Sequence, residues 1–155
     1  MRRFDSLDDL KACLGQEFAT SEWFAIDQQR IDLFAEATGD HQWIHVDPER
    51  AAKGPYGSTV AHGFLTLSML GVFSPSAFQV GDVKMGVNYG LNKVRFPAPV
   101  KVGSQVRARY TLQSMERLEP LGELHGYQFV IVVTVDVAGG AKPACVAEYV
   151  SRRYH

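Results

Sequence analysis

Acidic and imidazole side chains gather between Gly39 and Ser68, a stretch that holds three of the five histidines. Asp40 and His45 lie five positions apart, which would place them on different faces of a helix. Gly39 and Pro48 flank them, and both residue types interrupt helices. In an irregular loop, a carboxylate and an imidazole can converge on one water molecule. One group then orients the water while the other exchanges its proton, which is general acid–base chemistry.

Two other interpretations of this stretch stay open. Asp40 could simply cap local backbone amides, with His45 an ordinary loop histidine. Alternatively, His41 and His45, four positions apart, could bind a metal together with Asp40, Asp47 or His62. The flanking glycine and proline argue against the helix that would align those two histidines, and no Glu follows His41 as a zinc-protease motif requires. We therefore expect no metal.

His62 and Gly63 stand at the start of an apolar segment that reads as a buried helix. The first backbone amides of a helix lack internal partners, and glycine lets a ligand approach them closely. A polarised carbonyl oxygen would be stabilised there, as in an oxyanion hole. The alternative is that Gly63 only permits close packing of the helix on a sheet. Ser68 could orient a site residue or bond the carbonyl four residues earlier.

Nucleophilic catalysis fits the sequence poorly. None of Ser58, Ser68 and Ser74 lies in a Gly-x-Ser-x-Gly setting, and neither Cys13 nor Cys145 adjoins a histidine. Basic residues alternate along the expected strands, where they could reach substrate phosphates or form a solvated sheet face. These residues are Lys93, Arg95, Arg107 and Arg109.

The composition fits one domain of 155 residues, with 46% hydrophobic and 21% charged residues. The net charge of −1 and the lack of a basic block argue against nucleic acid or an anionic membrane as partner. No apolar stretch is long enough to span a bilayer, and the N-terminus does not resemble a signal peptide. The two cysteines are expected to be buried thiols in a reducing cytoplasm.

Apolar periodicity and breaker residues predict an α+β fold in which a curved antiparallel sheet wraps around one buried helix. Short helices are expected over residues 4–14, 27–39 and 48–53, with a loop over 40–46 and a strand within 18–26. The buried helix begins near residue 61 and ends at Ser74-Pro75. Four long strands follow, over residues 86–96, 105–116, 125–137 and 142–153.

Three motifs occur in order: Asp40-x-x-x-x-His45; Ala61-His62-Gly63-Phe64-Leu65-Thr66-Leu67-Ser68; and Tyr89-Gly90-x-Asn92-x-x-Arg95-Phe96-x-x-Pro99-Val100-x-x-Gly103. With them the chain resembles the MaoC-like dehydratases, the (R)-specific enoyl-CoA hydratases of the hydratase 2 type. The resemblance covers residues 21–153. The run Asp-His-Gln-Trp-Ile-His-Val-Asp-Pro is most similar to a bacterial subgroup that includes nodulation protein N-like members.

The resemblance implies a hot-dog fold, with a long central helix wrapped by an antiparallel sheet. It also implies a homodimer with acyl-CoA sites near the interface. Asp40 and His45 match the catalytic dyad of the family, Gly63 the amide donor to the thioester oxygen, and Ser68 a supporting polar residue. His62 is a further supporting candidate.

The chain departs from the family at one point near the dyad. Many hydratases have Asn-Pro where this chain has Gln42-Trp43. Gln42 keeps the capacity to hydrogen-bond and is expected to support the substrate site. The bulky Trp43 is expected to reshape the pocket, and with it the acyl-chain preference rather than the chemistry.

The implied activity is reversible addition of water to trans-2-enoyl-CoA, giving (R)-3-hydroxyacyl-CoA without a cofactor. Three alternatives stay open because fold alone does not choose among them. They are a hot-dog acyl-CoA thioesterase, a dehydratase acting on carrier-protein-bound chains, and a non-catalytic acyl-CoA-binding module.

Overall fold

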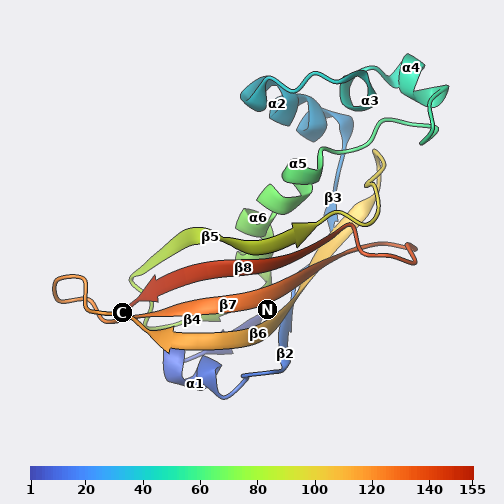
Figure 1. The fold of residues 1–155 in the computed structure, drawn as a ribbon. Coiled ribbons are helices and arrows are strands. Elements are labelled where there is room, and N and C mark those ends of the chain that lie inside the picture. Colours follow the sequence, from blue (N-terminus) through green and yellow to red (C-terminus); the bar gives the residue numbers. More distant parts are fainter.

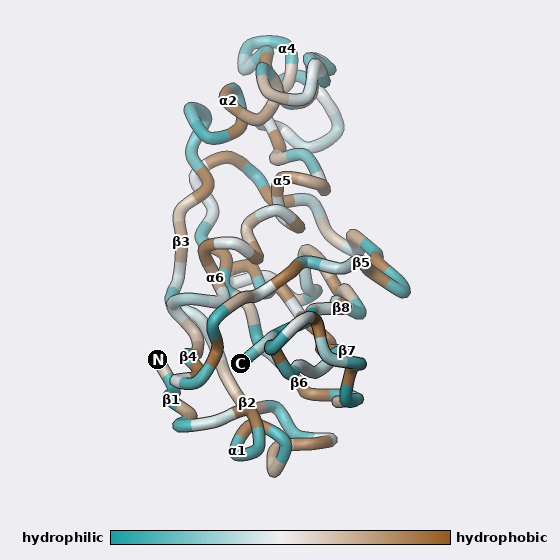
Figure 2. The backbone as a smooth tube through the Cα atoms, turned by 90° about the vertical axis from the view of Figure 1, so that its left-hand side faces the viewer, coloured by the Kyte–Doolittle hydropathy of each residue, from teal (hydrophilic) through white to brown (hydrophobic).

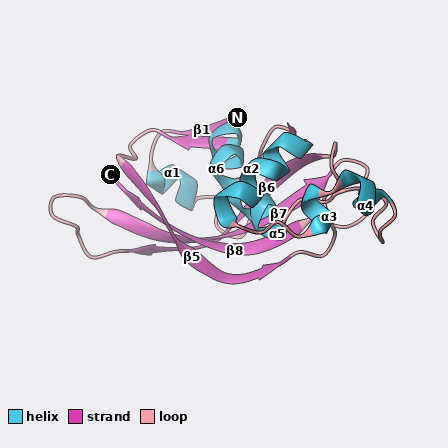
Figure 3. Cartoon of the chain, turned by 90° about the horizontal axis from the view of Figure 1, so that it is seen from above, coloured by secondary structure: helices cyan, strands magenta, loops and turns pink.

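A curved antiparallel sheet carries the helices on its concave side (Figures 1 and 3). The computed structural model describes residues 1–155. The main sheet has the strand order β2-β6-β7-β8-β5, with β3 also pairing with β6. Its strands are β2 (Glu17–Thr20), β3 (Phe24–Ala25), β5 (Met85–Arg95), β6 (Gln105–Arg117), β7 (Gly126–Val137) and β8 (Cys145–Tyr154). This architecture confirms the α+β hot-dog fold.

The helices fall into three groups in Figure 1. The helices α5 (Gly63–Ser68) and α6 (Leu70–Ala77) lie along the sheet. Beyond the end of the sheet lie α2 (Gln28–Thr38), α3 (Trp43–Val46) and α4 (Pro48–Ala52). At the opposite end, α1 (Leu7–Lys11) lies near a small parallel pair formed by β1 (Arg2–Phe4) and β4 (Phe78–Val80). No helix has the length and apolar character needed to cross a membrane.

The core forms where the inward-facing residues of the long strands meet α5 and α6. Strand side chains alternate between the two faces, so every second residue is buried from Val106 to Leu112 on β6 and from Phe129 to Val135 on β7. Figure 2 shows the matching brown, hydrophobic positions along the tube. One cluster of 26 buried residues results. Its largest fully buried members include Tyr110, Phe73, Phe129, Leu112 and Ile131.

The segment that carries the site begins where α2 ends. Asp27 caps the N-terminus of this helix, and its side chain accepts a hydrogen bond from the Arg30 amide. At the other end Gly39 adopts a left-handed φ of 74°, and its amide bonds the Ala35 carbonyl. A left-handed backbone conformation costs less energy at glycine than at any other residue. Both predicted ends of α2 are confirmed, and the chain turns away from the helix directly before Asp40.

The predicted central helix is confirmed in place but was wrong in two details. It is broken at Met69 into α5 and α6, and α6 continues past Pro75 to Ala77. Proline removes the hydrogen bond to the carbonyl four residues earlier, here that of Gly71. Gly71 lies on the exposed side of the helix, where water can replace the lost donor. The helix is also not buried all round, because Phe64 is 65% exposed.

Three other expectations were wrong in extent. The N-terminal helix covers only α1, and Phe4 belongs to β1 instead. The expected strand within residues 18–26 is two strands, both paired with β6. The expected loop over residues 40–46 ends in the single turn of α3. The four long strands are confirmed close to their predicted ranges.

Phe73 anchors α6 to the sheet, so we predict a large loss of stability for Phe73→Ala. Its side chain is fully buried and its ring lies 5.6 Å from that of Phe24 on β3, measured between centroids. Truncation of a buried phenylalanine costs about 3–5 kcal/mol of unfolding free energy. Urea unfolding measures the loss, with Leu33→Ala as control, since Leu33 is 64% exposed. Equal losses for the two variants would contradict this packing.

Candidate active site

His45 is held in one tautomer by a hydrogen bond to the main chain. It lies on α3, is 7% exposed, and its Nδ1 is 2.6 Å from the Val60 carbonyl oxygen. A carbonyl can only accept, so Nδ1 carries the proton and donates it. The other ring nitrogen, Nε2, is therefore left with a lone pair. In this form the imidazole can accept a proton at Nε2.

Gln28 fixes the backbone of His45, a role that the sequence did not predict. Its side-chain amide donates to the His45 carbonyl at 2.8 Å, and its amide oxygen accepts a bond from the Thr59 hydroxyl. Gln28 lies at the start of α2, whereas Thr59 directly precedes Val60. The two bonds therefore tie α2, α3 and the segment before α5 together around the imidazole.

His62 holds the main chain at Asp40. Its Nε2 lies 2.9 Å from the Asp40 carbonyl oxygen and donates to it, and the residue is only 4% exposed. Its ring stacks on that of His45, with centroids 3.8 Å apart and planes 24° apart. The Phe34 ring lies 5.0 Å away from the His62 ring. His62 thus spaces Asp40 and His45 relative to each other.

The two members of the expected dyad lie close together. Side-chain ligand atoms of Asp40, His45 and His62 all lie within 4.8 Å of one another. The Asp40 side chain is 55% exposed, whereas His45 is buried. The Gln42 amide approaches Asp40 Oδ1 at 3.4 Å. A water molecule beside this pair would meet an exposed carboxylate and a buried imidazole.

The pKa of His45 is lowered from its ordinary value, and burial is the main cause. Burial disfavours the charged imidazolium because the surrounding protein solvates it less well than water does. The hydrogen bond to the Val60 carbonyl opposes this shift, nearby His62 adds to the lowering, and the Asp40 charge raises the pKa. The net direction keeps His45 neutral, and so able to accept a proton, near neutral pH.

His45 and Gly63 line the same cavity, of about 330 Å³. Gly63 is the first residue of α5, so its amide has no acceptor within the helix. A Cβ atom at this position would lie 2.9 Å from the Phe96 ring. Glycine is therefore required here for close packing, and the same lack of a side chain leaves the amide approachable. The structure thus supports the packing interpretation, and the role of the Gly63 amide as a donor to a ligand stays a prediction.

The side chains of Ser68 and Gln42 lie outside the cluster of Asp40, His45 and His62. The Ser68 hydroxyl donates to the Phe64 carbonyl at 2.7 Å, the ordinary bond for a helical serine. It lines a separate cavity with Leu67, not the one that contains His45. The Gln42 side chain is exposed, and its contact with Asp40 is made by its backbone amide. Their supporting roles stay predictions.

The expected effect of Trp43 on the pocket was wrong. Its ring is packed against Gly54, where a Cβ atom would lie 2.9 Å from it, and Arg50 stacks over it at 4.5 Å. Trp43 is not among the residues that line the cavity of His45. The bulky indole is therefore used to fold the segment onto itself, not to shape the cavity.

The cluster of Asp40, His45 and His62 could hold a metal by its ligand types. The stacked rings argue against it, because stacked imidazoles direct their in-plane lone pairs side by side. A tetrahedral metal needs lone pairs that converge on one point. His41 lies apart, exposed, with Nε2 at 3.7 Å from Glu36. The arrangement favours proton transfer over metal binding.

The basic residues of the sheet are partly paired within it. The Arg109 side chain bonds both Asp136, at 2.9 Å, and Glu17, at 2.8 Å, while Arg107 lies 3.6 Å from Asp136. Lys93 is exposed on the edge strand. Of the two roles considered, contact with substrate phosphates and a solvated sheet face, this pattern matches the solvated sheet face.

Known proteins share both this sequence and this fold. The chain is 54% identical over 152 residues to the 3-hydroxyacyl-thioester dehydratase Z of Mycobacterium tuberculosis H37Rv, which covers 98% of each chain. It is 44% identical to nodulation protein N of Rhizobium leguminosarum bv. viciae, over 94% of this chain and 89% of that protein. These matches confirm the resemblance to the nodulation protein N-like subgroup.

The fold is shared with an (R)-hydratase from A. caviae involved in PHA biosynthesis, with a TM-score of 0.66. The two chains are 22% identical, over 89% of this chain and 94% of the other. The family model described as the MaoC like domain matches residues 9–132. The matched residues include Asp40, His45, His62 and Gly63. The chain therefore belongs to the MaoC-like dehydratase family.

Proposed function

We propose that the protein is an (R)-specific hydratase and dehydratase that adds water reversibly to trans-2-enoyl-CoA. The observation that carries the proposal is a buried imidazole with a free Nε2, which lies close to the Asp40 carboxylate and lines one cavity with Gly63. The most similar relatives reported above include a protein named as a 3-hydroxyacyl-thioester dehydratase. The same site removes water from the 3-hydroxyacyl thioester in reverse.

In this mechanism Asp40 and His45 hold one water molecule. Nε2 of His45 takes a proton from the water as its oxygen forms a bond to the β-carbon. The π electrons move toward the thioester, whose oxygen gains negative charge. The dyad then returns a proton to the α-carbon on the same face. Water and proton thus add to one side of the double bond.

The Gly63 amide stabilises the charge that develops on the thioester oxygen. A donor positioned for this oxygen acts most strongly where water is excluded. The helix α5 has only six residues before the break at Met69, so we assign this stabilisation to the amide itself. A helix macrodipole needs several aligned turns to develop.

We predict that Asp40→Asn and His45→Gln each lower the rate of crotonyl-CoA hydration by about a hundred-fold or more. Each change removes one proton-transfer group while keeping a side chain of similar size. Loss of the enoyl-thioester absorbance measures the rate. His41→Gln is the matched control, since His41 is exposed and lies outside the dyad. His45→Gln with near-full activity would exclude the assignment.

The same assay separates the alternatives. Release of free thiol, without an (R)-3-hydroxybutyryl-CoA product, would indicate the thioesterase. Activity only on carrier-protein-bound chains would indicate the carrier-dependent dehydratase. Binding of acyl-CoA without turnover, unchanged in both dyad variants, would indicate a non-catalytic module. Longer enoyl-CoA substrates are included because crotonyl-CoA is short.

The pH profile provides an independent prediction. Because burial lowers the pKa of His45, the neutral imidazole persists below pH 6.5, the ordinary value for histidine. The acidic limb of kcat/KM, which reports groups of the free enzyme, should therefore have its midpoint below pH 6.5. Steady-state rates between pH 5 and 8 measure it. A midpoint at or above 6.5 would contradict a buried neutral base.

We propose that two copies pair through β5. This strand lies at the edge of the sheet, is eleven residues long, and is exposed along nearly its whole length. An uncovered edge of this length invites pairing with another strand. Its apolar members Val87, Tyr89 and Leu91 are exposed, as is Phe64 on α5 nearby. Antiparallel pairing of β5 with itself gives a two-fold, self-complementary interface.

We predict a solution mass of twice the 17.2 kDa of one chain. Tyr89→Lys should shift the mass toward the monomer, because a lysine on an edge strand opposes pairing. Light scattering after size exclusion measures this, with Leu33→Lys on α2 as control. A monomeric wild type would exclude the dimer, and a Tyr89→Lys dimer would exclude β5 as its interface.

We further propose that the protein works in the cytoplasm on soluble acyl-CoA, as a homodimer and without nucleic acid or membrane partners. Cys13 and Cys145 are both buried and unpaired, which fits a reducing compartment. The net charge of −1 gives no electrostatic preference for nucleic acid or an anionic lipid surface.

A further inference from the structure

A groove between α5–α6 and the inner face of β5 and β8 lies beside the cavity of His45 and shares no lining residue with it. It consists of two cavities of about 240 and 250 Å³ that share four lining residues. The shared residues are Leu70, Gly71, Asn88 and Tyr149. The groove starts at Leu67, about one helical turn beyond Gly63, and extends to Ser74. It therefore follows the helices that begin at the thioester end of the site.

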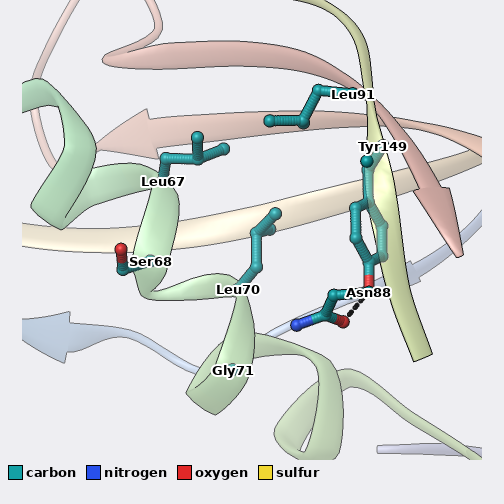
Figure 4. A pocket seen from close by; sticks show the side chains of 8 residues that line it. Leu67, Ser68, Leu70, Gly71, Asn88, Leu91 and Tyr149 are labelled. Atoms are coloured by element: carbon teal, nitrogen blue, oxygen red, sulfur yellow. Dashed lines mark hydrogen bonds between the residues drawn. The ribbon is translucent and has the colours of Figure 1, made fainter. Parts of the chain in front are cut away.

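The groove changes from apolar to polar along its length. Near Gly63, Leu67, Leu70 and Leu91 line it, as Figure 4 shows from close by. In the middle the Tyr149 hydroxyl bonds the Asn88 side chain, drawn there as a dashed line. A saturated hydrocarbon tail would fit only the first part of this groove.

The far end of the groove contains a cation and two hydroxyls. Arg153, Ser151 and Ser74 line it. Ser151 and Arg153 follow Tyr149 at every second position of β8, so all three side chains face inward. The Ser74 hydroxyl is shared with Tyr110 at 3.2 Å. The Ser151 hydroxyl donates to the Val87 carbonyl at 3.4 Å, so Arg153 and Ser74 are the groups that can donate to a ligand oxygen.

Arg153 is partly buried and has no acidic partner. No carboxylate lies within 4 Å of it, whereas Arg109 is paired with two. Its guanidinium instead lies 5.0 Å from the Phe78 ring. Burial lowers the pKa of Arg153, which reflects the cost of removing its charge from water. An anion at the end of the groove would offset this cost.

We propose that the groove binds the acyl chain and that Arg153 binds a carboxylate at the distal end of that chain. The preferred substrates are then enoyl thioesters of dicarboxylic acids. Guanidinium suits this ligand because its planar fork matches a carboxylate with two parallel hydrogen bonds. The inference rests on the proposed hydratase activity and adds the chemical class of its acyl chain.

The length of the groove indicates the length of the chain. Eleven residues separate Gly63 from Ser74. At about 1.5 Å per residue they span roughly 16 Å. An extended chain advances roughly 1.2 Å per bond, so the eleven bonds of a twelve-carbon chain span roughly 13 Å. A hydrogen bond of about 2.9 Å at its distal carboxylate brings the reach to roughly 16 Å.

The test compares pairs of CoA thioesters of equal length, with and without a distal carboxylate. We expect the dicarboxylic trans-2-dodecenedioyl-CoA to exceed trans-2-dodecenoyl-CoA in kcat/KM by about ten- to a hundred-fold, as for a charge-assisted bidentate pair. The corresponding pair of hexenoyl thioesters should differ little, because the shorter chain does not reach Arg153. Equal kcat/KM values for the two twelve-carbon thioesters would overturn the proposal.

Arg153→Met should remove the carboxylate preference while preserving the volume of the side chain. Arg152→Met is the matched control, because Arg152 points to the opposite face, where it bonds Gln128 and stacks on Tyr89. It should leave the preference unchanged. If Arg153→Met lowers kcat/KM equally for both thioesters of a pair, Arg153 has a structural role and the proposal is overturned.

Two outcomes separate this inference from the proposed function. Turnover of crotonyl-CoA without any carboxylate preference would contradict only the role of Arg153. No hydration of any enoyl-CoA would contradict the activity itself. If Arg153→Met does not fold, Arg153→Lys replaces it, since a lysine keeps the charge but lacks the bidentate fork. The comparison of substrate pairs in the wild type needs no variant.

Discussion

The hydrogen bond from His45 Nδ1 to the Val60 carbonyl is the constraint on which the site depends. It joins α3, which lies beyond the end of the sheet, to the segment that leads into α5. It also decides the tautomer, and so leaves a free lone pair on Nε2. The Gln28 amide bonds both the His45 carbonyl and Thr59, next to Val60. His45 is thus held by one hydrogen bond at its ring and by another at its backbone carbonyl.

The parts of this structure that local chemistry determines could be predicted from the sequence. The long strands follow from alternation of apolar residues, and both ends of α2 follow from Asp27 and Gly39. The proximity of Asp40 and His45 was allowed by a loop that Gly39 begins, but their spacing left the dyad open and the family resemblance favoured it. The break at Met69 could not be predicted, since nothing at that position is a breaker. Leu65, Met69 and Phe73 are buried on both sides of the break and at it, a tertiary feature that residue types do not indicate.

The positioning contacts could not be predicted because they join side chains to distant main-chain atoms. Gln28 reaches the backbone 17 positions away, and His62 reaches the Asp40 carbonyl 22 positions away. A carbonyl group is the same at every residue, so its use leaves no trace in residue type. His62 was expected near the site, but the sequence held no signal that it would support Asp40 and stack on His45.

The helix pair α5–α6 connects the chemistry to the selection of substrate. One side of it is fixed in the core through Leu65, Met69 and Phe73, all at most 5% exposed. Its start presents the Gly63 amide, and its other side lines the groove toward Arg153. Because a helix advances by a fixed rise per residue, the distance between these two points is set by packing, not by flexible loops. If the groove binds the acyl chain as proposed, the same core contacts that stabilise the fold also fix the distance between the two ends of the substrate.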